Sequence, residues 1–182
     1  RGVKHYMQRT ALQGDPGLLS KALGEYLPGA PMDEGTVHPF RLRLGELEPG
    51  YTLKTGSRTI TLDDIEHFAD FTGDNFYAHM DEEAAKASPI FGGRVAHGYL
   101  ILSFAAGLFV DAPPGPVLAN YGLEHLRFVK PMKPGDSMKV SLTVRSKSQR
   151  SAEMGEVRWA VRVTNQDDEL CATYDLLTMN AV

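Results

Sequence analysis

Apolar and polar residues alternate along the second half of the chain. Two such runs are Met138, Val140, Leu142, Val144 and Val157, Trp159, Val161, Val163. Alternation with a period of two is typical of antiparallel strands that place one face on a core. The turn-forming sequences KPMKPGD and NQDDE separate the runs. We therefore predict strands over residues 117–129, 136–148, 154–165 and 169–180.

The stretch AHGYLILSFAAGLFVD, residues 96–111, has a different pattern, because apolar residues cover every side of the expected helix. Such a helix is buried all round, and it is too short to cross a bilayer, so the same protein must enclose it. A β-permissive segment at 51–60 precedes this helix, and the four predicted strands follow it. This order predicts an α+β fold, the hot-dog architecture, in which a curved antiparallel sheet wraps around one long helix.

Helix start and stop signals flank the middle of the chain. Thr61 and Asp64 form a capping-box pattern ahead of an apolar stripe, which predicts a short helix to about Thr72. Gly73 suits the end of that helix. Asp81, followed by two glutamates, suits the start of another. The residues between the two signals form a loop.

Residues 1–50 are rich in glycine and proline, as in GDPG, LPGAP and EPG, with only a short helical possibility at 16–26. We interpret them as a lead-in or linker, and residues 51–182 as the folded domain. The first residue is Arg1 rather than methionine, which suggests a processed chain or an excised piece.

Composition narrows the classes of partner. The 182 residues carry a net charge of -4 and no run of lysine and arginine, so we expect neither nucleic acid nor an anionic membrane surface as a partner. The single cysteine, Cys171, fits a reducing compartment, and its apolar surroundings indicate a core position. The first ten residues lack the apolar stretch of a secretion signal. We therefore expect a cytoplasmic location.

The stretch TGDNFYAHMDEEAA, residues 72–85, places Asp74 and His79 five positions apart. On spacing alone, both residues are ordinary solvated members of a loop. A carboxylate and an imidazole side by side can, however, hold one water molecule and move its protons. The spacing leaves two interpretations open, a surface loop or a catalytic pair.

Three stretches together, TGDNFYAH, FGGRVAHGYLILS and LRFVKPMKPGD, resemble the MaoC-like, (R)-specific enoyl-CoA hydratase family. Gly73, Asp74 and His79 occupy the positions that carry the chemistry in that family's motif. Phe76 and Tyr77 replace its asparagine and proline. The resemblance favours the catalytic interpretation of the aspartate and the histidine.

The departure at Phe76 and Tyr77 resembles one subgroup, the oxepin-CoA hydrolase domains that are fused to an aldehyde dehydrogenase in phenylacetate degradation. The stretch RGVKHYMQRTALQG at 1–14, which resembles the end of the dehydrogenase region, and ANYGLEHLRF from 119 are similar to that subgroup. The resemblance implies covalent fusion to an aldehyde dehydrogenase domain. The chain itself has neither a catalytic cysteine in a suitable loop nor a dinucleotide-binding glycine-rich turn.

The family resemblance implies hydration of a carbon–carbon double bond conjugated to a coenzyme A (CoA) thioester. Asp74 is then the principal base, and His79 is its partner in positioning water and transferring protons. Which of the two returns the final proton stays open. Backbone N–H groups at the helix start, at Gly98, suit stabilisation of the enolate oxygen. A glycine chosen for packing between helix and sheet is the alternative.

Further side chains are candidates for binding the substrate. Phe76 and Tyr77 should narrow and flatten the pocket, which favours a planar ring. His97 either lines the pocket or is a structural histidine at a helix end. Ser103 offers a hydroxyl on the same helix, although helix serines often bond their own backbone. The basic candidates for CoA phosphates, or else for a solvated turn, are Arg127, Lys130 and Lys133.

We expect no cofactor, since CoA is part of the substrate. We also expect no metal, because the remaining histidines show no close pairing with one another or with cysteine; they are His5, His38, His67 and His125. A single curved sheet leaves edges and part of its helix poorly covered, so we expect a homodimer or a higher homo-oligomer.

Three functions remain in competition: ring-opening hydration of an oxepin-CoA, generic (R)-3-hydroxyacyl-CoA dehydration, and non-catalytic acyl-CoA binding or assembly. Thioesterases share the hot-dog fold, but Gly73, Asp74 and His79 followed by AHG favour hydration over thioester cleavage. A pure binding domain has no need of a proton-transfer pair.

Overall fold

Four long strands form most of one antiparallel sheet. The structure is a computed structural model that describes residues 37–182, and its long strands are β3 (Val117–Phe128), β4 (Ser137–Gln149), β5 (Met154–Thr164) and β6 (Leu170–Ala181). The strand order is β1-β4-β5-β6-β3. All four long strands agree with the predicted ranges to within one residue at each end, which confirms the alternating pattern as a strand signal.

The predicted strand over 51–60 consists of two short strands. Both β1 (Thr52–Lys54) and β2 (Arg58–Thr59) pair with β4. Between them, Thr55 donates its hydroxyl to the Gly56 carbonyl. A glycine weakens a strand because it adds backbone freedom without a side chain to pack. Pairing therefore stops and restarts within one segment.

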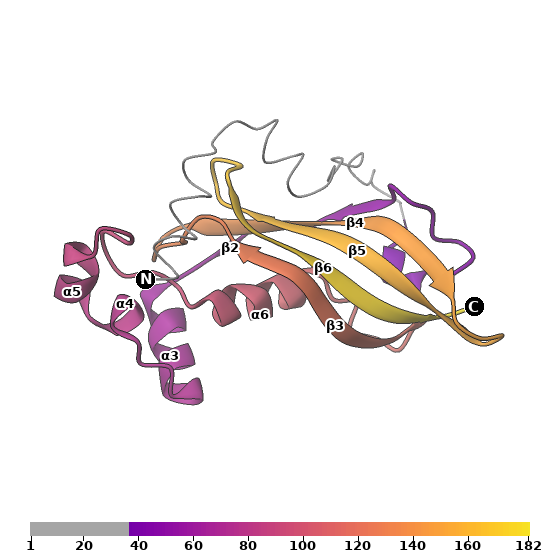
Figure 1. Ribbon diagram of the computed structural model, residues 1–182, viewed down its shortest axis with the longest axis horizontal. Helices are drawn as coiled ribbons and strands as arrows, with labels where there is room; N and C mark the ends of the chain where they lie inside the picture. The colour runs from indigo at the N-terminus through magenta and orange to yellow at the C-terminus, as the bar shows by residue number, and fades with distance from the viewer. Residues whose placement is uncertain (1–36) are drawn as a thin grey trace.

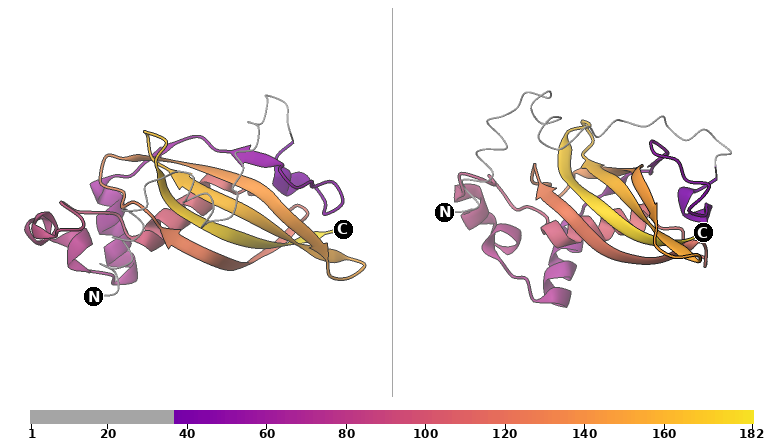
Figure 2. Two further views of the ribbon diagram at one scale, coloured as in Figure 1. Left: turned by 45° about the horizontal axis from the view of Figure 1, so that its top comes forward. Right: turned by 45° about the vertical axis from the view of Figure 1, so that its right-hand side comes forward.

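Helix α6 (Gly98–Phe109) lies along the curved sheet (Figures 1 and 2). A sheet that bends around one long helix confirms the predicted α+β hot-dog architecture. The helix is not buried all round, however. Tyr99 is 69% exposed, and Ser103 and Gly107, each four residues further on, are also exposed. That part of the prediction is wrong for the described chain, because one sheet covers only one side of a helix.

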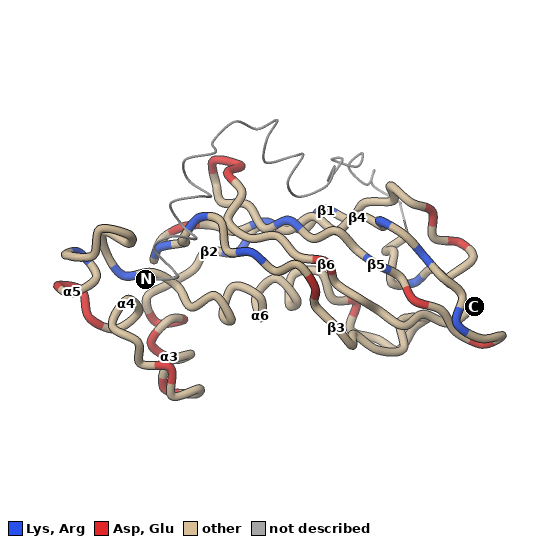
Figure 3. Tube along the Cα trace, in the orientation of Figure 1, with Lys and Arg blue, Asp and Glu red and all other residues tan. Residues whose placement is uncertain are grey.

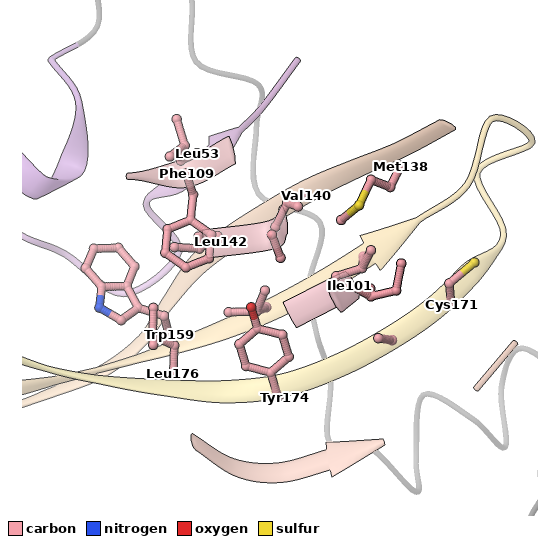
Figure 4. Packing of buried hydrophobic residues seen from close by; sticks show 14 of the residues in the cluster. Leu53, Ile101, Phe109, Met138, Val140, Leu142, Trp159, Cys171, Tyr174 and Leu176 are labelled. Carbon is pink, nitrogen blue, oxygen red and sulfur yellow. The ribbon is translucent and has the colours of Figure 1, made fainter. Parts of the chain in front are cut away.

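The core fills the space between α6 and the sheet. Figure 4 shows Ile101 of the helix in one cluster with Trp159 and Tyr174 of the strands. Trp159 is fully buried and donates its indole N–H to Thr178 Oγ1 at 2.8 Å, so its polar atom is satisfied. Cys171 is buried in the same cluster, which confirms its predicted core position.

The segment before β1 also belongs to the packed domain. It contains the 3-10 helix η1 (Pro39–Arg41), and Phe40, Leu44 and Leu47 are buried in the core cluster. Packing therefore begins earlier than residue 51, where glycine and proline content placed the boundary. Glycine and proline indicate turns whether or not the turns are packed on a core, so their content does not locate the boundary of a domain. The helical possibility at 16–26 lies outside the described residues.

Three short helices gather at one end of the sheet (Figure 1): α3 (Leu62–Thr72), α4 (Tyr77–Met80) and α5 (Glu82–Ala87). Helix α3 begins at the predicted capping box and ends at Gly73, whose φ of 79° is the left-handed conformation that glycine adopts readily. Asp81 caps α5 as predicted. The one-turn helix α4, which the sequence pattern did not indicate, lies between them.

Acidic and basic residues are distributed differently between the short helices and the sheet. Acidic residues gather on α3 and α5, while lysine and arginine are prominent on the strands (Figure 3). Several of the acids occupy first helical turns, where they favour the positive end of the helix dipole. Within residues 37–182, no helix is long and apolar enough to cross a membrane.

Candidate active site

The turn after α3 presents Asp74. Gly73 ends the helix in the left-handed conformation, and the next residues form a short loop before α4. The Asp74 backbone N–H donates to Thr72 Oγ1 at 3.3 Å, and its carboxylate accepts no hydrogen bond from the described residues. Asp74 and His79 both line one cavity. The fold thus brings the two predicted catalytic residues to a common space.

His79 is oriented by its own hydrogen bond. Its Nδ1–H donates to the Val95 carbonyl at 2.7 Å, which leaves Nε2 free to accept or deliver a proton. Burial lowers the pKa of His79, and the neighbouring His97 and Arg94 lower it further, against the opposing effects of the Val95 carbonyl and Asp74. The neutral form is therefore favoured near neutral pH, and its free nitrogen is a base.

Arg94 holds the backbone around His79. Its Nε–H donates to the His79 carbonyl at 2.5 Å, and its Nη1 contacts Glu66 Oε1 of α3 at 2.9 Å. The Arg94 side chain is only 11% exposed. Arg94 was not among the site residues predicted from the sequence, although it lies in FGGRVAHGYLILS, one of the stretches that resemble the family. Arg94 ties α3, α4 and the segment before α6 together.

His97 takes the structural alternative rather than lining the cavity. It is 1% exposed, and its Nε2–H donates to the Asp74 carbonyl at 2.9 Å. Its ring stacks on His79 with centroids 3.8 Å apart and planes 29° apart. Among the described residues, His97 Nδ1 has no partner. His97 therefore contacts both Asp74 and His79 without lining the cavity.

Gly98 lies at the cavity and also at a close contact. A Cβ on Gly98 would lie 2.5 Å from Cζ of the Phe128 ring, so the packing alternative raised from the sequence holds. Gly98 also lines the cavity with Asp74 and His79. The N-cap His97 makes no side-chain capping hydrogen bond, which leaves the first N–H groups of α6 without that partner. Such groups favour developing negative charge.

The cavity has a volume of about 290 Å³. Asp74 and His79 are among its polar lining residues, with Lys130, and most of the other lining residues are apolar: Phe91, Val95, Ala96, Gly98, Ile101, Phe128, Pro131 and Met132, with Tyr99 and Cys171. Burial raises the pKa of the Cys171 thiol to about 11, so it stays protonated at neutral pH. The sequence placed Cys171 in the core but did not indicate that it faces a cavity.

Two aromatic candidates do not line the cavity. Phe76 and Tyr77 are 53% and 40% exposed and pack against each other with ring centroids 4.5 Å apart. In the described chain neither residue lines the cavity, although the Phe76 ring lies edge-on to that of His79 with centroids 6.0 Å apart. They lie at the start of α4 with their rings outward, because the buried side of that one-turn helix is taken by Ala78.

The polar candidates for substrate binding differ in whether they line the cavity. Ser103 is exposed and donates its hydroxyl to the Tyr99 carbonyl at 2.9 Å, so it bonds its own helix and takes no part in the cavity. Arg127 is exposed and does not line the cavity, although its neighbour Phe128 does. Lys130 lines the cavity and pairs with Glu169. Lys133 donates to the Gly92 carbonyl at 3.1 Å, next to the cavity-lining Phe91.

Ligand-capable atoms of Asp74, His79 and His97 lie within 4.8 Å of one another. Each imidazole donates one ring N–H to a backbone carbonyl, and the remaining nitrogen of His97, Nδ1, is buried without a partner among the described residues. The cluster therefore suits proton transfer better than chelation by both rings.

A second cluster, Glu124, His125 and Asp175, lies outside the cavity lining. Asp175 is buried, and its carboxylate accepts from His125 Nδ1 at 2.9 Å, Arg158 Nη1 at 2.9 Å and Arg145 Nη1 at 3.2 Å. Burial by itself raises the pKa of Asp175, but these hydrogen bonds and charges outweigh it, so the net pKa is lowered. The Asp175 carboxylate is thus fully engaged by protein donors.

Most of this chain is similar to a known family of domains. Residues 46–167 match the profile of the MaoC like domain. The chain is 52% identical over 162 residues to Protein MaoC of Klebsiella aerogenes, an alignment that covers 87% of this chain and 48% of that protein. The chain therefore spans about half the length of that relative.

Two solved structures with a similar fold support the same family. The MaoC-like dehydratase from Rhodospirillum rubrum superimposes with a TM-score of 0.68 at 25% identity, covering 77% of this chain and 97% of that one. The R-hydratase PhaJ1 from Pseudomonas aeruginosa gives 0.62 at 30% identity, covering 77% and 86%. With the profile match over most of its length, this chain belongs to the MaoC-like dehydratase family.

Proposed function

We propose that this domain adds water to the carbon–carbon double bond of an enoyl-CoA thioester. The observation that carries the proposal is the convergence of Asp74, His79 Nε2 and the start of α6 on one largely apolar cavity. A carboxylate and a neutral imidazole can share one water molecule there, beside donors for an oxyanion. The R-hydratase from Pseudomonas aeruginosa, at 30% identity, supports the same reaction class.

The proposed reaction has two steps, addition of water and return of a proton to the α-carbon. Asp74, the principal base, removes one proton from water while the water oxygen bonds to the β-carbon. The electron pair of the double bond moves through the α-carbon onto the thioester oxygen, where the backbone N–H of Gly98 stabilises the charge. The enolate then takes a proton at the α-carbon, either directly from the protonated Asp74 carboxyl or from His79 Nε2 after that nitrogen has received the proton from Asp74. The product is a β-hydroxyacyl thioester.

For the substrate, we propose an oxepin-CoA from phenylacetate degradation. Water adds to the enol-ether double bond of the seven-membered ring, and the hemiacetal-type product opens to an aldehyde. The subgroup resemblance at residues 76 and 77 supports this proposal, together with the cavity aromatics Phe91 and Phe128. Phe76 and Tyr77 give no support through pocket shape, since their rings are exposed. We further propose an aldehyde dehydrogenase domain in the same full-length chain.

A generic (R)-specific hydratase is the second candidate, and the similarity to the R-hydratase PhaJ1 favours it. The two functions are separated by measuring kcat/KM for an oxepin-CoA and for crotonyl-CoA on one preparation, with trapping of the aldehyde. We expect the oxepin-CoA to be the better substrate. A preference for crotonyl-CoA of about tenfold or more, which is about 1.4 kcal/mol in the transition state, would transfer the assignment to the generic hydratase.

We also propose that the domain acts as a homodimer. Strand β3 is a terminal strand of the sheet and exposes Leu118, Tyr121 and Leu123. The uncovered side of α6 exposes Tyr99 as well. An unpaired edge with apolar side chains is typical of a contact between copies. Light scattering at micromolar concentration should give twice the chain mass, and a fully active monomer would contradict the proposal.

A further inference from the structure

His97 occupies a helix N-cap without capping the helix. An N-cap side chain ordinarily accepts an N–H from the first turn, but His97 makes no such bond. Its imidazole is buried and donates Nε2–H across 23 residues of sequence to the Asp74 carbonyl. A buried polar ring is costly unless it is hydrogen-bonded, and its other nitrogen has no partner among the described residues. The Nε2 contact is therefore the one bond that this burial secures.

The Asp74 backbone has little other support. Its N–H reaches Thr72 Oγ1 at 3.3 Å, near the long limit of a hydrogen bond. The carboxylate itself accepts no hydrogen bond from the described residues. The bond from His97, at 2.9 Å, is thus the shorter of the two hydrogen bonds that the Asp74 backbone makes to described side chains. A displacement of the carboxylate by about 1 Å is enough to cost about a hundredfold in rate.

The same ring supports His79. The two imidazoles stack at 3.8 Å, while the Nδ1–H of His79 is held by the Val95 carbonyl. One contact fixes the ring plane and the other fixes its rotation. One buried side chain therefore touches both members of the catalytic pair and faces neither the water nor the substrate.

We propose that His97 is a positioning residue that sets the separation between the Asp74 carboxylate and Nε2 of His79. The inference rests on the proposed function of that pair, but the contacts behind it do not. The feature that matters is a donor at the place of His97 Nε2, so a side chain of another type that puts an N–H there should substitute for it.

Two amides test this requirement. The amide nitrogen of glutamine can reach the place of Nε2, whereas that of asparagine reaches only the place of Nδ1. His97→Gln should therefore keep kcat within about threefold of wild type. His97→Asn should lower kcat by about tenfold or more with KM changed far less, because the pair is misplaced rather than the binding surface removed. His97→Leu should resemble the asparagine variant.

The pH profile adds a readout that a purely structural role would not move. The charged or titratable groups that face His79 are Asp74 from the loop, Arg94, which pairs with Glu66 of α3, and His97. The neighbouring His97 contributes to lowering the pKa of His79. Removing the His97 ring should shift the acid limb of kcat/KM to higher pH in all three variants.

A substrate-free measurement separates this proposal from the proposed function. The carbonyl ¹³C resonance of Asp74 reports whether that oxygen accepts a hydrogen bond. We expect wild type and His97→Gln to share one shift, and His97→Asn and His97→Leu to share another. That pattern in a protein without hydratase activity would sustain the positioning role and reject the proposed function. Equal rates in the folded glutamine and asparagine variants of an active protein would overturn the positioning role, whether or not the leucine variant folds.

Discussion

Two clusters among residues 37–182 bring an aspartate together with histidine, and their surroundings differ. At the helical end, Asp74 and His79 line a cavity, and the Asp74 carboxylate accepts no hydrogen bond from the described residues. On the sheet, the Asp175 carboxylate is buried and is engaged by His125, Arg158 and Arg145. The residue types are alike, but one carboxylate is left available and the other is saturated with donors.

The difference separates chemistry from stability. A carboxylate that is to take a proton from water must keep a lone pair open, which costs it the stabilisation that donors would give. A buried carboxylate without a catalytic task is stable only when every lone pair is satisfied. We therefore expect changes at the cavity to reduce activity and changes around Asp175 to reduce stability.

The largest expected effect is on turnover. Asp74→Asn and His79→Ala should each lower kcat by about a hundredfold or more, because each removes a proton-transfer group. The free energy of unfolding should change little for Asp74→Asn, since no donor loses a partner. Steady-state hydration assays and circular dichroism measure both quantities. Asp70→Asn, at an exposed acid of α3, is the matched control and should behave as wild type.

Asp175→Asn should show the reverse behaviour. Replacing the carboxylate weakens its charge-assisted hydrogen bonds, so the free energy of unfolding should fall by about 2 kcal/mol. The kcat/KM of the folded fraction should stay within about threefold, because Asp175 does not line the cavity. Urea denaturation beside the hydration assay gives both values. A large loss of activity at unchanged stability would erase the distinction between the clusters.

The two clusters should also respond to acid in different pH windows. The pKa of His79 is lowered from 6.5, chiefly by burial, so kcat/KM should fall only once the pH drops below that value. The pKa of Asp175 is lowered from 3.8 despite its burial, so its stabilisation is complete above the unfolded value and is lost as the pH falls through the folded one. Activity should therefore decline at a pH where this contribution to stability is still intact. If activity and stability declined over the same pH range, the result would argue against a catalytic role for His79 and a purely stabilising role for Asp175.

The smallest effect is expected at His125. Its side chain is 68% exposed, so solvent screens its pairing with Asp175. His125→Gln should change the free energy of unfolding by about 0.5 kcal/mol or less and leave kcat unaltered. Urea curves compared with those of Asp175→Asn make the measurement. A loss as large as that of the aspartate variant would show that the exposed histidine, not the arginines, holds the carboxylate.

Local sequence determined the elements of this fold. Alternation marked the strands because a half-buried sheet exposes every second side chain, and this requirement acts within a few residues. The capping box ahead of α3 and the left-handed Gly73 after it were also readable, since caps satisfy backbone groups of neighbouring residues. The resemblance of TGDNFYAH to a known motif indicated Asp74 and His79, which spacing alone left open.

Tertiary structure decided which side chains meet. His97 reaches Asp74 and Arg94 reaches His79 from segments that no local period connects. The hydrophobicity pattern did not predict that one side of α6 is exposed, because the pattern reports how apolar a helix is and not how many elements surround it. The sequence pattern does not explain why Asp175 lies in an apolar strand. The tertiary structure does, because its hydrogen-bond donors come from β3, β4 and β5. Distances between remote segments arise only when the whole sheet curves around its helix, so no single stretch of the chain contains them.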